Sequence, residues 1–153
     1  MIQSAAGKIE RIVALRMTPG SDVLAGIIET CEKYQIKDGV IISALGSWRK
    51  VTFCNPTDLP NGKVGYGDPT VFEGNFELLS LSGIICHDTD GKILPHAHLT
   101  ISDEKGNAYG GHLMPGCEVL LTTDMVIGAI TGIEMGRRMD EELGVPLFFP
   151  KNK

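Results

Sequence analysis

The stretch of this chain that most constrains its fold is a short run of strict alternation between polar and apolar residues. The run extends from Pro95 to Ser102; its polar members are His96, His98, Thr100 and Ser102, and its apolar members are Ala97, Leu99 and Ile101. Successive side chains of a β-strand point to opposite faces, so the run predicts a strand with one polar face and one face toward a core. Both histidines then lie on the polar face.

The residues that follow predict that this strand belongs to a β-hairpin. Asp103–Asn107 is polar, contains a glycine and has a length that commonly closes a hairpin. With Lys105 at its midpoint, His98 and His112 lie opposite one another in the simplest antiparallel register, with Cβ atoms about 5 Å apart. The residues before His112 on this face are an alanine and a glycine, which leave space above the imidazoles.

Three histidines on one face predict a metal site. His96, His98 and His112 provide three imidazoles and leave one coordination position open, as in catalytic rather than structural zinc sites. Imidazole also suits iron, nickel and copper, so the expected cofactor is a divalent transition metal ion with zinc as the first candidate. A slip of one residue in the hairpin would turn His112 to the other face, and the histidines would then be ordinary polar strand residues.

The remaining histidine and the cysteines are expected to lie outside this site. His87 falls in the turn-like segment Cys86–Gly91, where we expect an exposed loop residue. The four cysteines are Cys31, Cys54, Cys86 and Cys117. Because they are scattered without CxxC spacing, we expect buried free thiols rather than a zinc site built on sulfur. The sequence shows no signal peptide and no membrane-spanning run, so the expected location is the reducing cytoplasm, with no membrane partner.

Composition favours one globular domain over a nucleic-acid-binding surface. Hydrophobic residues make up 42% of the 153-residue chain, enough for one substantial core. The net charge of -5 and the pI near 5.3 oppose a broad attraction to phosphates, which need a concentrated basic surface. We interpret the basic pairs Arg49–Lys50 and Arg137–Arg138 as solvated ends of secondary-structure elements.

Hydrophobic periodicity predicts one principal helix among many strands. From Asp22 to Tyr34 apolar residues recur at helical spacing, and Ser21 is placed to cap the helix. The expected strands are Ile9–Met17, Val40–Gly46, Lys50–Cys54, Val71–Phe76, Glu77–Cys86 and Glu118–Ile130, with a loop over Asn55–Asp68 and a short helix over Arg137–Leu143. The predicted fold class is therefore α/β of the α+β type, a single domain with a mainly antiparallel sheet and one helix packed on it.

Several motifs, in this order along the chain, resemble the plants-and-prokaryotes-conserved (PPC) domain. They are Pro19–Asp22, Gly74–Gly83, Pro95–Leu99 and Gly110–Leu113. The resemblance covers nearly the whole chain, so we expect one PPC-like domain over residues 5–150. It implies an α/β fold with a mainly antiparallel sheet and a homotrimer. It also implies that the histidines lie near a subunit boundary, where a neighbouring chain would complete the pocket.

The resemblance also implies partners. In plants the domain accompanies AT-hook motifs in nuclear proteins, and its stand-alone prokaryotic relatives are described as predicted DNA-binding proteins. This chain lacks the arginine-glycine-arginine-proline core of an AT-hook, so an association with DNA or with transcription-related proteins rests on analogy. By the same resemblance, the stretch implicated in partner contacts is Gly74, Asn75, Phe76, Glu77, Leu78 and Leu79. Its apolar half also fits the core side of a strand.

Two classes of function remain open from the sequence. In the first, the chain is a trimeric binding or regulatory module, associated with DNA or transcription-related partners, whose metal is structural or sensory. In the second, it is a small metal-dependent enzyme of the hydrolase or lyase type acting on an unknown small molecule at the histidines. Glu77 is then a candidate fourth ligand, an orienting partner of a histidine, or a catalytic base.

Two further residues belong to the enzyme hypothesis. Trp48 and Arg49 follow a glycine-containing turn after a buried strand, which is a favoured place for residues that line a pocket. Arg49 would hold a small anionic substrate and Trp48 would line its pocket. The alternatives are an ordinary exposed arginine, a tryptophan that covers a sheet edge and, for Glu77, a surface glutamate.

Overall fold

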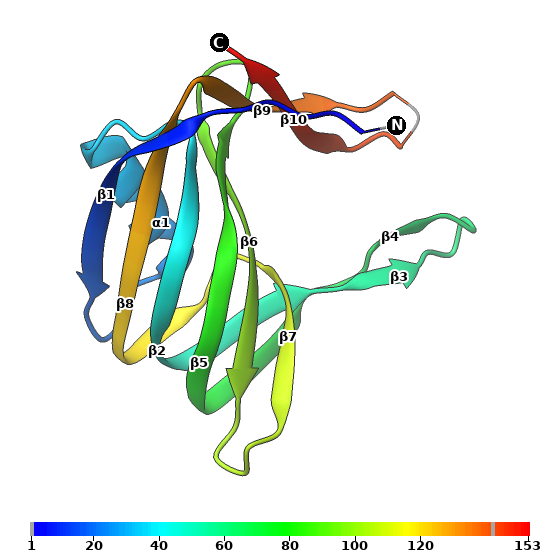
Figure 1. The fold of residues 1–153 in the computed structure, drawn as a ribbon. Helices are drawn as coiled ribbons and strands as arrows, with labels where there is room; N and C mark the ends of the chain where they lie inside the picture. Colours follow the sequence, from blue (N-terminus) through cyan, green and yellow to red (C-terminus); the bar gives the residue numbers. More distant parts are fainter. Residues whose placement is uncertain (1, 142) are drawn as a thin grey trace.

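The computed structural model of the protein describes residues 2–141 and 143–153 (Figure 1). Its elements are β1 Lys8–Met17, α1 Val23–Lys33, β2 Gly39–Cys54, β3 Pro56–Asp58, β4 Val64–Tyr66, β5 Thr70–His87, β6 Ile93–Ser102, β7 Ala108–Leu113, β8 Glu118–Thr131, β9 Ile133–Met139 and β10 Pro146–Asn152. The described chain is thus a small, mostly β domain with one helix, which agrees with the predicted α+β class.

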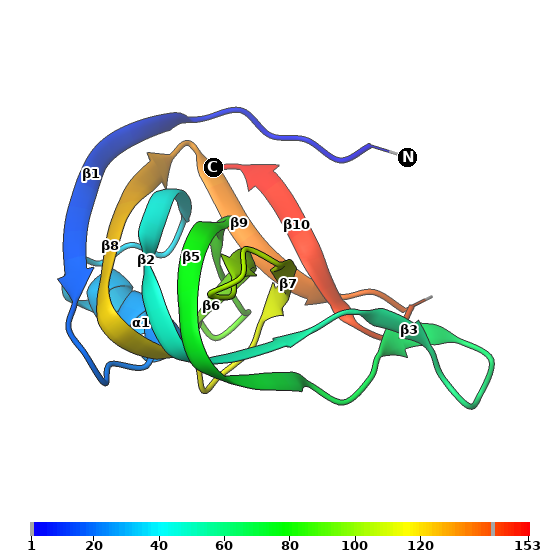
Figure 2. The same ribbon diagram turned by 90° about the horizontal axis from the view of Figure 1, so that it is seen from below.

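Eight of the strands form one strongly curled sheet, part of which closes into a barrel (Figure 1; Figure 2). The strand order is β1-β8-β2-β7-β6-β5-β9-β10, and β2 also pairs with β5 along much of its length. Because the end of β2, at Phe53 and Cys54, pairs with β7, the strands β2, β5, β6 and β7 close on themselves. Each of the two histidine-bearing strands therefore has a paired strand on both sides: β6 lies between β5 and β7, and β7 lies between β6 and the end of β2.

Helix α1 packs on the curled sheet and contacts β6, β1 and β8. Asp22 caps it, because Oδ1 accepts a hydrogen bond from Ala25 N at 2.8 Å and Oδ2 accepts one from Gly116 N at 3.0 Å. The N-cap is therefore Asp22 and not the expected Ser21, and each of its two carboxylate oxygens accepts a hydrogen bond from a backbone N–H group. The buried face of the helix consists of Val23, Ile27 and Cys31. In the part of the chain that the structure describes, no helix is long and apolar enough to span a membrane.

The core lies between the helix and the inner face of the sheet. Trp48 is completely buried there, and its Nε1 donates a hydrogen bond to Oγ1 of Thr123 at 2.8 Å. Burying an indole costs free energy unless its N–H finds an acceptor, so this bond is what permits the largest side chain of the chain to occupy the core. The other large, fully buried side chains include Ile27, Ile36, Leu78, Leu81, Ile85, Ile101, Met125 and Ile127.

Two long strands replace pairs of shorter predicted ones. β2 runs without a break through the stretch where a glycine turn was expected, and its register against β5 and β8 shifts between Trp48 and Lys50. β5 likewise continues from Thr70 to His87, with a register shift between Leu78 and Ser80. Such shifts bend a strand without ending it, so both strands follow the curl of the sheet.

Two other local predictions are wrong. The segment Asn55–Asp68, expected to be a loop, contains the β3–β4 hairpin. Of the segment Arg137–Leu143, expected to be a short helix, residue 142 lies outside the described residues. The described part is instead the end of β9 and turn residues, because β9 pairs residue by residue with β10 from Ile133 to Met139. Pairing with a strand that follows in sequence outweighs a weak local preference for helix.

The β3–β4 and β9–β10 hairpins both project from the same side of the barrel (Figure 1). Both carry exposed apolar side chains; these are Val64 and Tyr66 on the first, and Met139, Leu147 and Phe148 on the second. Exposed apolar groups gathered on projecting hairpins are typical of surfaces that contact another chain.

Candidate metal centre

The three histidines of the predicted hairpin converge in the structure. His98 on β6 pairs directly with His112 on β7, which is the predicted register. The ring centroids of His96 and His112 are 5.0 Å apart, those of His96 and His98 are 5.3 Å apart, and those of His98 and His112 are 5.4 Å apart. One ligand nitrogen from each ring lies within 4.8 Å of the others. The register slip that would have separated His112 from the other two therefore does not occur.

Close packing of the neighbouring strands fixes this register. A Cβ atom on Gly110 of β7 would come within 2.4 Å of the Leu99 carbonyl oxygen, and one on Gly83 of β5 would come within 2.4 Å of the His96 carbonyl oxygen. Glycine at both positions lets β5 and β7 approach β6 from its two sides. The two histidines of β6 are thereby held from both edges of their strand.

The surroundings of His96 and His112 favour the neutral form of both imidazoles. The pKa of His96 is lowered to about 4, and partial burial is the main reason. The electrostatic effects of the neighbouring His112, Arg137 and His98 contribute the rest. Partial burial, and then His98 and Arg137, also lowers the pKa of His112. Metal ions bind the neutral imidazole, so at neutral pH the rings of His96 and His112 are in the protonation state that ligation requires.

The donor set fits a metal ion. The Nδ1 atom of His112 is buried and has no hydrogen-bond partner among the described residues, although buried polar atoms are almost always partnered. The three ligand nitrogens lie within 4.8 Å of one another, so one ion between them would be bound by all three imidazoles. His96, His98 and His112 would hold the ion.

The sequence did not indicate that two further residues, Tyr66 and Arg137, lie near this cluster. The ring of Tyr66, in a segment expected to be a loop, has its centroid 5.6 Å from that of His112. Arg137, interpreted as a solvated end, is instead near enough to His96 and His112 to lower the pKa of both. Its Nη2 donates to the Pro146 carbonyl oxygen at 2.8 Å. No local pattern marks either residue, because hairpins distant in sequence bring them to the centre.

The remaining histidine lies outside the cluster, but it is not the exposed loop residue that was expected. His87 ends β5, its side chain is only 16% exposed, and its Nε2 lies 3.3 Å from Oδ1 of the buried Asp38. Its Nδ1 lies 3.0 Å from the Asp88 carbonyl oxygen. The parallel contact of β5 with β9, at Gly136, covers this position, which the sequence alone does not reveal.

The structure does not bring Glu77 to the histidines. Glu77 is exposed and pairs with Ser102, four residues along β6 from His98, which corresponds to about 13 Å at the rise of a strand. It does share the polar face of the sheet, because the bulge in β5 restores the alternation. Direct ligation of an ion held by the three histidines therefore lies beyond its reach.

Trp48 and Arg49 also lie away from the centre. Trp48 is part of the core described above. Arg49 is exposed, its Nε lies 3.4 Å from Oε1 of Glu118, and it is five residues along β2 from Cys54, the partner of His112. At the rise of a strand this separation is about 16 Å.

The stretch implicated in partner contacts divides between core and surface. Leu78 is 1% exposed and packs in the core, and Phe76 is half-buried with its ring 5.9 Å from that of Phe72. The exposed members are Gly74, Asn75, Glu77 and Leu79. Asn75 Nδ2 donates to Oε1 of Glu104 at 2.6 Å, which ties the stretch to the β6–β7 turn.

The cysteines take no part in the centre. All four are buried and free, as predicted. Burial raises the pKa of Cys31 to about 12 and those of Cys86 and Cys117 to about 11, so these thiols stay protonated at neutral pH. A protonated thiol is a poor metal ligand, which leaves the imidazoles as the donor set.

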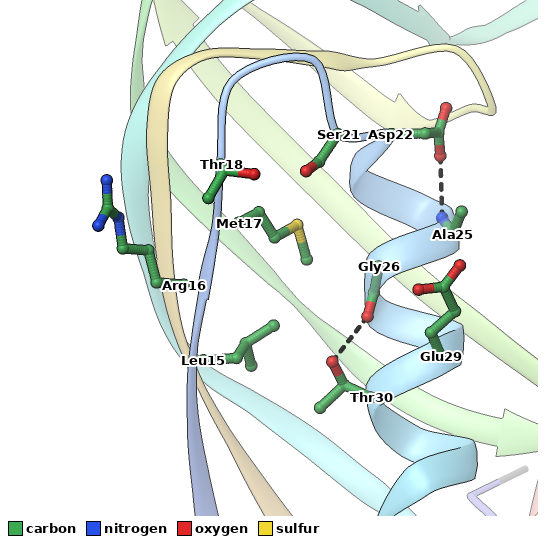
Figure 3. A pocket seen from close by; sticks show the side chains of 10 residues that line it. All are labelled: Leu15, Arg16, Met17, Thr18, Ser21, Asp22, Ala25, Gly26, Glu29 and Thr30. Carbon is green, nitrogen blue, oxygen red and sulfur yellow. Dashed lines mark hydrogen bonds between the residues drawn. The ribbon is translucent and has the colours of Figure 1, made fainter.

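A separate groove of about 460 Å³ lies between β1 and α1 (Figure 3). Its lining residues are Leu15, Arg16, Met17, Thr18, Ser21, Asp22, Ala25, Gly26, Glu29 and Thr30. Two of its polar side chains serve the helix, since Asp22 caps it and Thr30 Oγ1 donates to the Gly26 carbonyl oxygen at 2.7 Å. The groove contains none of the three clustered histidines and has no part in their chemistry.

Together, the curled sheet, the single helix and the three-histidine cluster define a small α+β protein with a candidate metal centre. The chain belongs to the Plants and Prokaryotes Conserved (PCC) domain family, whose model matches residues 4–131. This is the family that the sequence motifs resemble, so the predicted resemblance is confirmed.

Relatives of known name support this membership. The chain is 30% identical over 134 residues to a bifunctional protein GlmU of Synechococcus; the match covers 88% of this chain and 19% of that protein, so the chain spans about a fifth of the length of this relative. A structure of a metal-containing protein from Archaeoglobus fulgidus is 26% identical, with a TM-score of 0.83, and covers 97% of this chain and 99% of that chain. A PPC protein from Pyrococcus horikoshii is 23% identical, with a TM-score of 0.82, over 96% of both chains.

Two further structures share the fold at lower identity. The structure from Bacteroides thetaiotaomicron is 16% identical, with a TM-score of 0.77, and covers 94% of this chain and 96% of that chain. The structure from Ralstonia eutropha is 21% identical, with a TM-score of 0.73, and covers 88% of both chains. Both are named as candidate DNA-binding proteins. At this level of identity they show a shared fold alone.

Proposed function

We propose that this protein binds one divalent transition metal ion per chain through His96, His98 and His112, and acts as a metal-dependent binding module of its family. The observation that carries the proposal is the convergence of three imidazoles, one of which has a buried nitrogen without a hydrogen-bond partner among the described residues. Zinc is the first candidate, with iron and nickel as alternatives, because imidazole ligates all three. The metal-containing relative from Archaeoglobus fulgidus gives independent support.

Elemental analysis tests this proposal directly. The protein is purified without an affinity tag or chelator, beside a His96→Ala/His98→Ala double variant whose fold is checked by circular dichroism. We expect about one ion per chain in the wild type and none in the variant, because a single imidazole does not retain an ion. Equal metal contents in the two proteins, or none in the wild type after reconstitution, would refute the site.

We further propose that the functional unit is a homotrimer. Beyond the resemblance, support comes from the outer face of β1, β8 and β2, where large apolar side chains lie away from the core; they are Ile12, Ile42, Leu45 and Leu121, each at least half exposed. Several large apolar side chains exposed on one face favour burial against another copy. Light scattering at micromolar concentration is expected to give three times the chain mass of 16.5 kDa, and L45D/L121D to give a monomer. A wild-type monomer would refute this arrangement.

For DNA, we propose an association through a transcription-related partner rather than through this chain alone. The net charge of -5 provides no broad basic surface, while Asn75, Glu77 and Leu79 in the motif stretch are exposed to a partner. Fluorescence anisotropy with a labelled duplex is expected to show no salt-dependent binding by the isolated protein. Tight binding that weakens steeply with salt would show instead that the chain contacts phosphates itself.

For location, we propose the cytoplasm, because four buried free thiols suit a reducing compartment.

A second candidate function is a small metal-dependent enzyme. The observation that favours it is that three protein ligands leave one position for a small molecule when an ion is bound, which is the arrangement of catalytic sites. A bound ion would act as a Lewis acid on that molecule. Glu77 is too distant to exchange a proton directly at the centre, so we do not assign it that step. Hydrolysis of p-nitrophenyl acetate that is equal with and without added zinc would remove ester hydrolysis from this candidate.

A further inference from the structure

The β3–β4 hairpin brings an aromatic ring to the histidine cluster. The ring centroid of Tyr66 lies 5.6 Å from that of His112, with the two planes tilted by 44°. This separation is within the range at which aromatic rings attract one another. Among the described residues, no other ring from outside the cluster contacts any of its three histidines. Tyr66 is 53% exposed, and within the same residues its side chain has no hydrogen bond, so its ring contact with His112 is its main interaction.

The base of this hairpin is fixed to the histidine-bearing strand β7. Cys54, the last residue of β2, pairs with His112. The next residue, Asn55, donates a hydrogen bond from Nδ2 to the Gly110 carbonyl oxygen at 3.1 Å. A Cβ atom on Gly111 would come within 2.7 Å of Asn55 Oδ1, so glycine at this position makes room for the asparagine. The chain therefore leaves the barrel directly beside His112.

This anchored base also places Tyr66. Pro56, which follows Asn55, begins β3 and pairs with Tyr66 at the end of β4, where the hairpin departs from the barrel (Figure 1). Each strand of the hairpin has only three residues, and a two-stranded hairpin of this kind has little stability of its own. The position of Tyr66 therefore depends on the contacts at the base, which lie beside His112.

The imidazole of His112 lacks the support that a metal ligand usually has. A ligating histidine is normally oriented by a hydrogen bond to its second ring nitrogen. Among the described residues, neither ring nitrogen of His112 makes a hydrogen bond, although Nδ1 is buried. Its other ring contacts are with His96 and His98, at 5.0 Å and 5.4 Å between centroids, and these are themselves candidate ligands. The Tyr66 ring is thus the aromatic support that comes from outside the ligand set.

Resting on the proposed metal function, we infer that Tyr66 is a positioning residue of the metal centre. Its ring packs against the His112 imidazole and holds it in the orientation that ligation needs, in place of the usual hydrogen bond. The group that acts is the aromatic ring and not the phenol hydroxyl, and it acts through His112 without contacting the ion. The β3–β4 hairpin is in this assignment part of the centre.

The test compares metal binding by the full-length wild type with that of four variants: Y66A, Y66L, Y66F and V64A. Competition with a chromogenic chelator measures zinc affinity, and the visible absorption of the Co²⁺-loaded proteins reports ligand geometry. We expect Y66A and Y66L to weaken zinc binding about three- to tenfold and to alter the Co²⁺ spectrum, because both lose the ring. Y66F keeps the ring and is expected to match the wild type.

Val64 provides the matched control. It lies two residues earlier on β4 and is 72% exposed, so V64A shortens an apolar side chain of the same hairpin. We expect V64A to bind zinc as the wild type does. Because Tyr66 is more than half exposed, the urea midpoints of metal-free Y66A and V64A are also expected to agree. Should Y66A prove less stable, Y66L, which keeps an apolar side chain at this position, decides the result.

The outcomes separate this inference from the metal site itself. If the wild type binds neither zinc nor Co²⁺, the proposed metal function fails and the inference falls with it. If the wild type binds one ion per chain but Y66L binds zinc as tightly as V64A, with an unchanged Co²⁺ spectrum, the positioning role is refuted while the metal site stands. Equal weakening in Y66F and Y66L would also refute the inference, because the hydroxyl and not the ring would then support the centre.

Discussion

The histidines of this protein occupy two contrasting environments. His96, His98 and His112 face one another across two strands, and the buried Nδ1 of His112 has no partner among the described residues. His87 instead lies beside Asp38, and both of its ring nitrogens face oxygen atoms, one of the Asp38 carboxylate and one of the Asp88 carbonyl group.

The second environment is a satisfied structural network. The Asp38 carboxylate is buried, accepts a hydrogen bond from Met135 N at 2.6 Å and another from Lys153 Nζ at 2.7 Å, and stands 3.3 Å from His87. It thereby ties β9 and the residue after β10 to the start of β2. A buried polar group with all its partners thus serves the fold, whereas one left without a partner is available to a ligand.

The largest expected difference between the two environments is in metal affinity. His112→Ala removes one of three ligands and is expected to weaken zinc binding by more than about a hundredfold, since even the loss of residues that only orient ligands costs up to that much. His87→Ala is the matched control and is expected to bind zinc as the wild type does. Competition with a chromogenic chelator measures both, and equal weakening in the two variants would erase the distinction.

The next effect concerns the structural network. Asp38→Ala leaves the Met135 N–H and its charged neighbours without their acceptor, and is expected to lower the free energy of unfolding by about 2–4 kcal/mol. Urea unfolding monitored by circular dichroism measures the change. The variant is expected to keep its zinc stoichiometry. A loss of zinc from a folded Asp38→Ala protein would show that the two environments are coupled.

Zinc itself is expected to stabilise only through the first environment. At a free concentration one hundred times its Kd, an ion that binds the native state alone adds about 2.7 kcal/mol to the free energy of unfolding. Thermal unfolding with and without zinc is expected to show this gain in the wild type and in His87→Ala, but not in the His96→Ala/His98→Ala variant. Stabilisation of the double variant by zinc would place the ion elsewhere.

The smallest effect on stability is expected at the surface ion pair of Lys151 with Glu134, which resembles the pair that Lys153 makes with the buried Asp38. Lys151 and Lys153 both pair with carboxylates, but Lys151 contacts the surface Glu134 and Lys153 contacts the buried Asp38. Lys151→Met is expected to leave the urea midpoint at neutral pH unchanged, because salt and water screen such a pair. Lys153→Met is expected to lower it, since it deprives a buried carboxylate of a donor. Equal midpoints for the two variants would contradict the contrast.

The pH dependence of the surface pair has a defined sign. Lys151, through its hydrogen bond and its charge, lowers the pKa of Glu134 below its ordinary value. Any contribution of the pair to stability is therefore present at neutral pH and is lost as the pH falls through the lowered pKa. Any difference between Lys151→Met and the wild type is accordingly expected to vanish in acid.

Much of the architecture followed from local pattern. The alternation of Pro95–Ser102 and the turn after it predicted the hairpin and the pairing of His98 with His112, because period and turn length are local properties. The periodicity of α1 predicted its buried face for the same reason. The partners of Arg137 and His87 were not predictable, because each depends on β9, whose place beside β5 no local pattern encodes.

The class of fold, the hairpin and the three imidazoles on one face could thus be predicted before the structure, since these depend on the alternation and spacing of neighbouring residues. The groups that surround the imidazoles depend instead on contacts between strands that are distant in sequence. They place Tyr66 beside His112 and Arg137 within electrostatic range of His96, set Glu77 and Arg49 far along the sheet, and put Trp48 in the core. The reason is physical: side-chain neighbours across strands are set by how the sheet curls and closes, and that is a property of the packed chain as a whole.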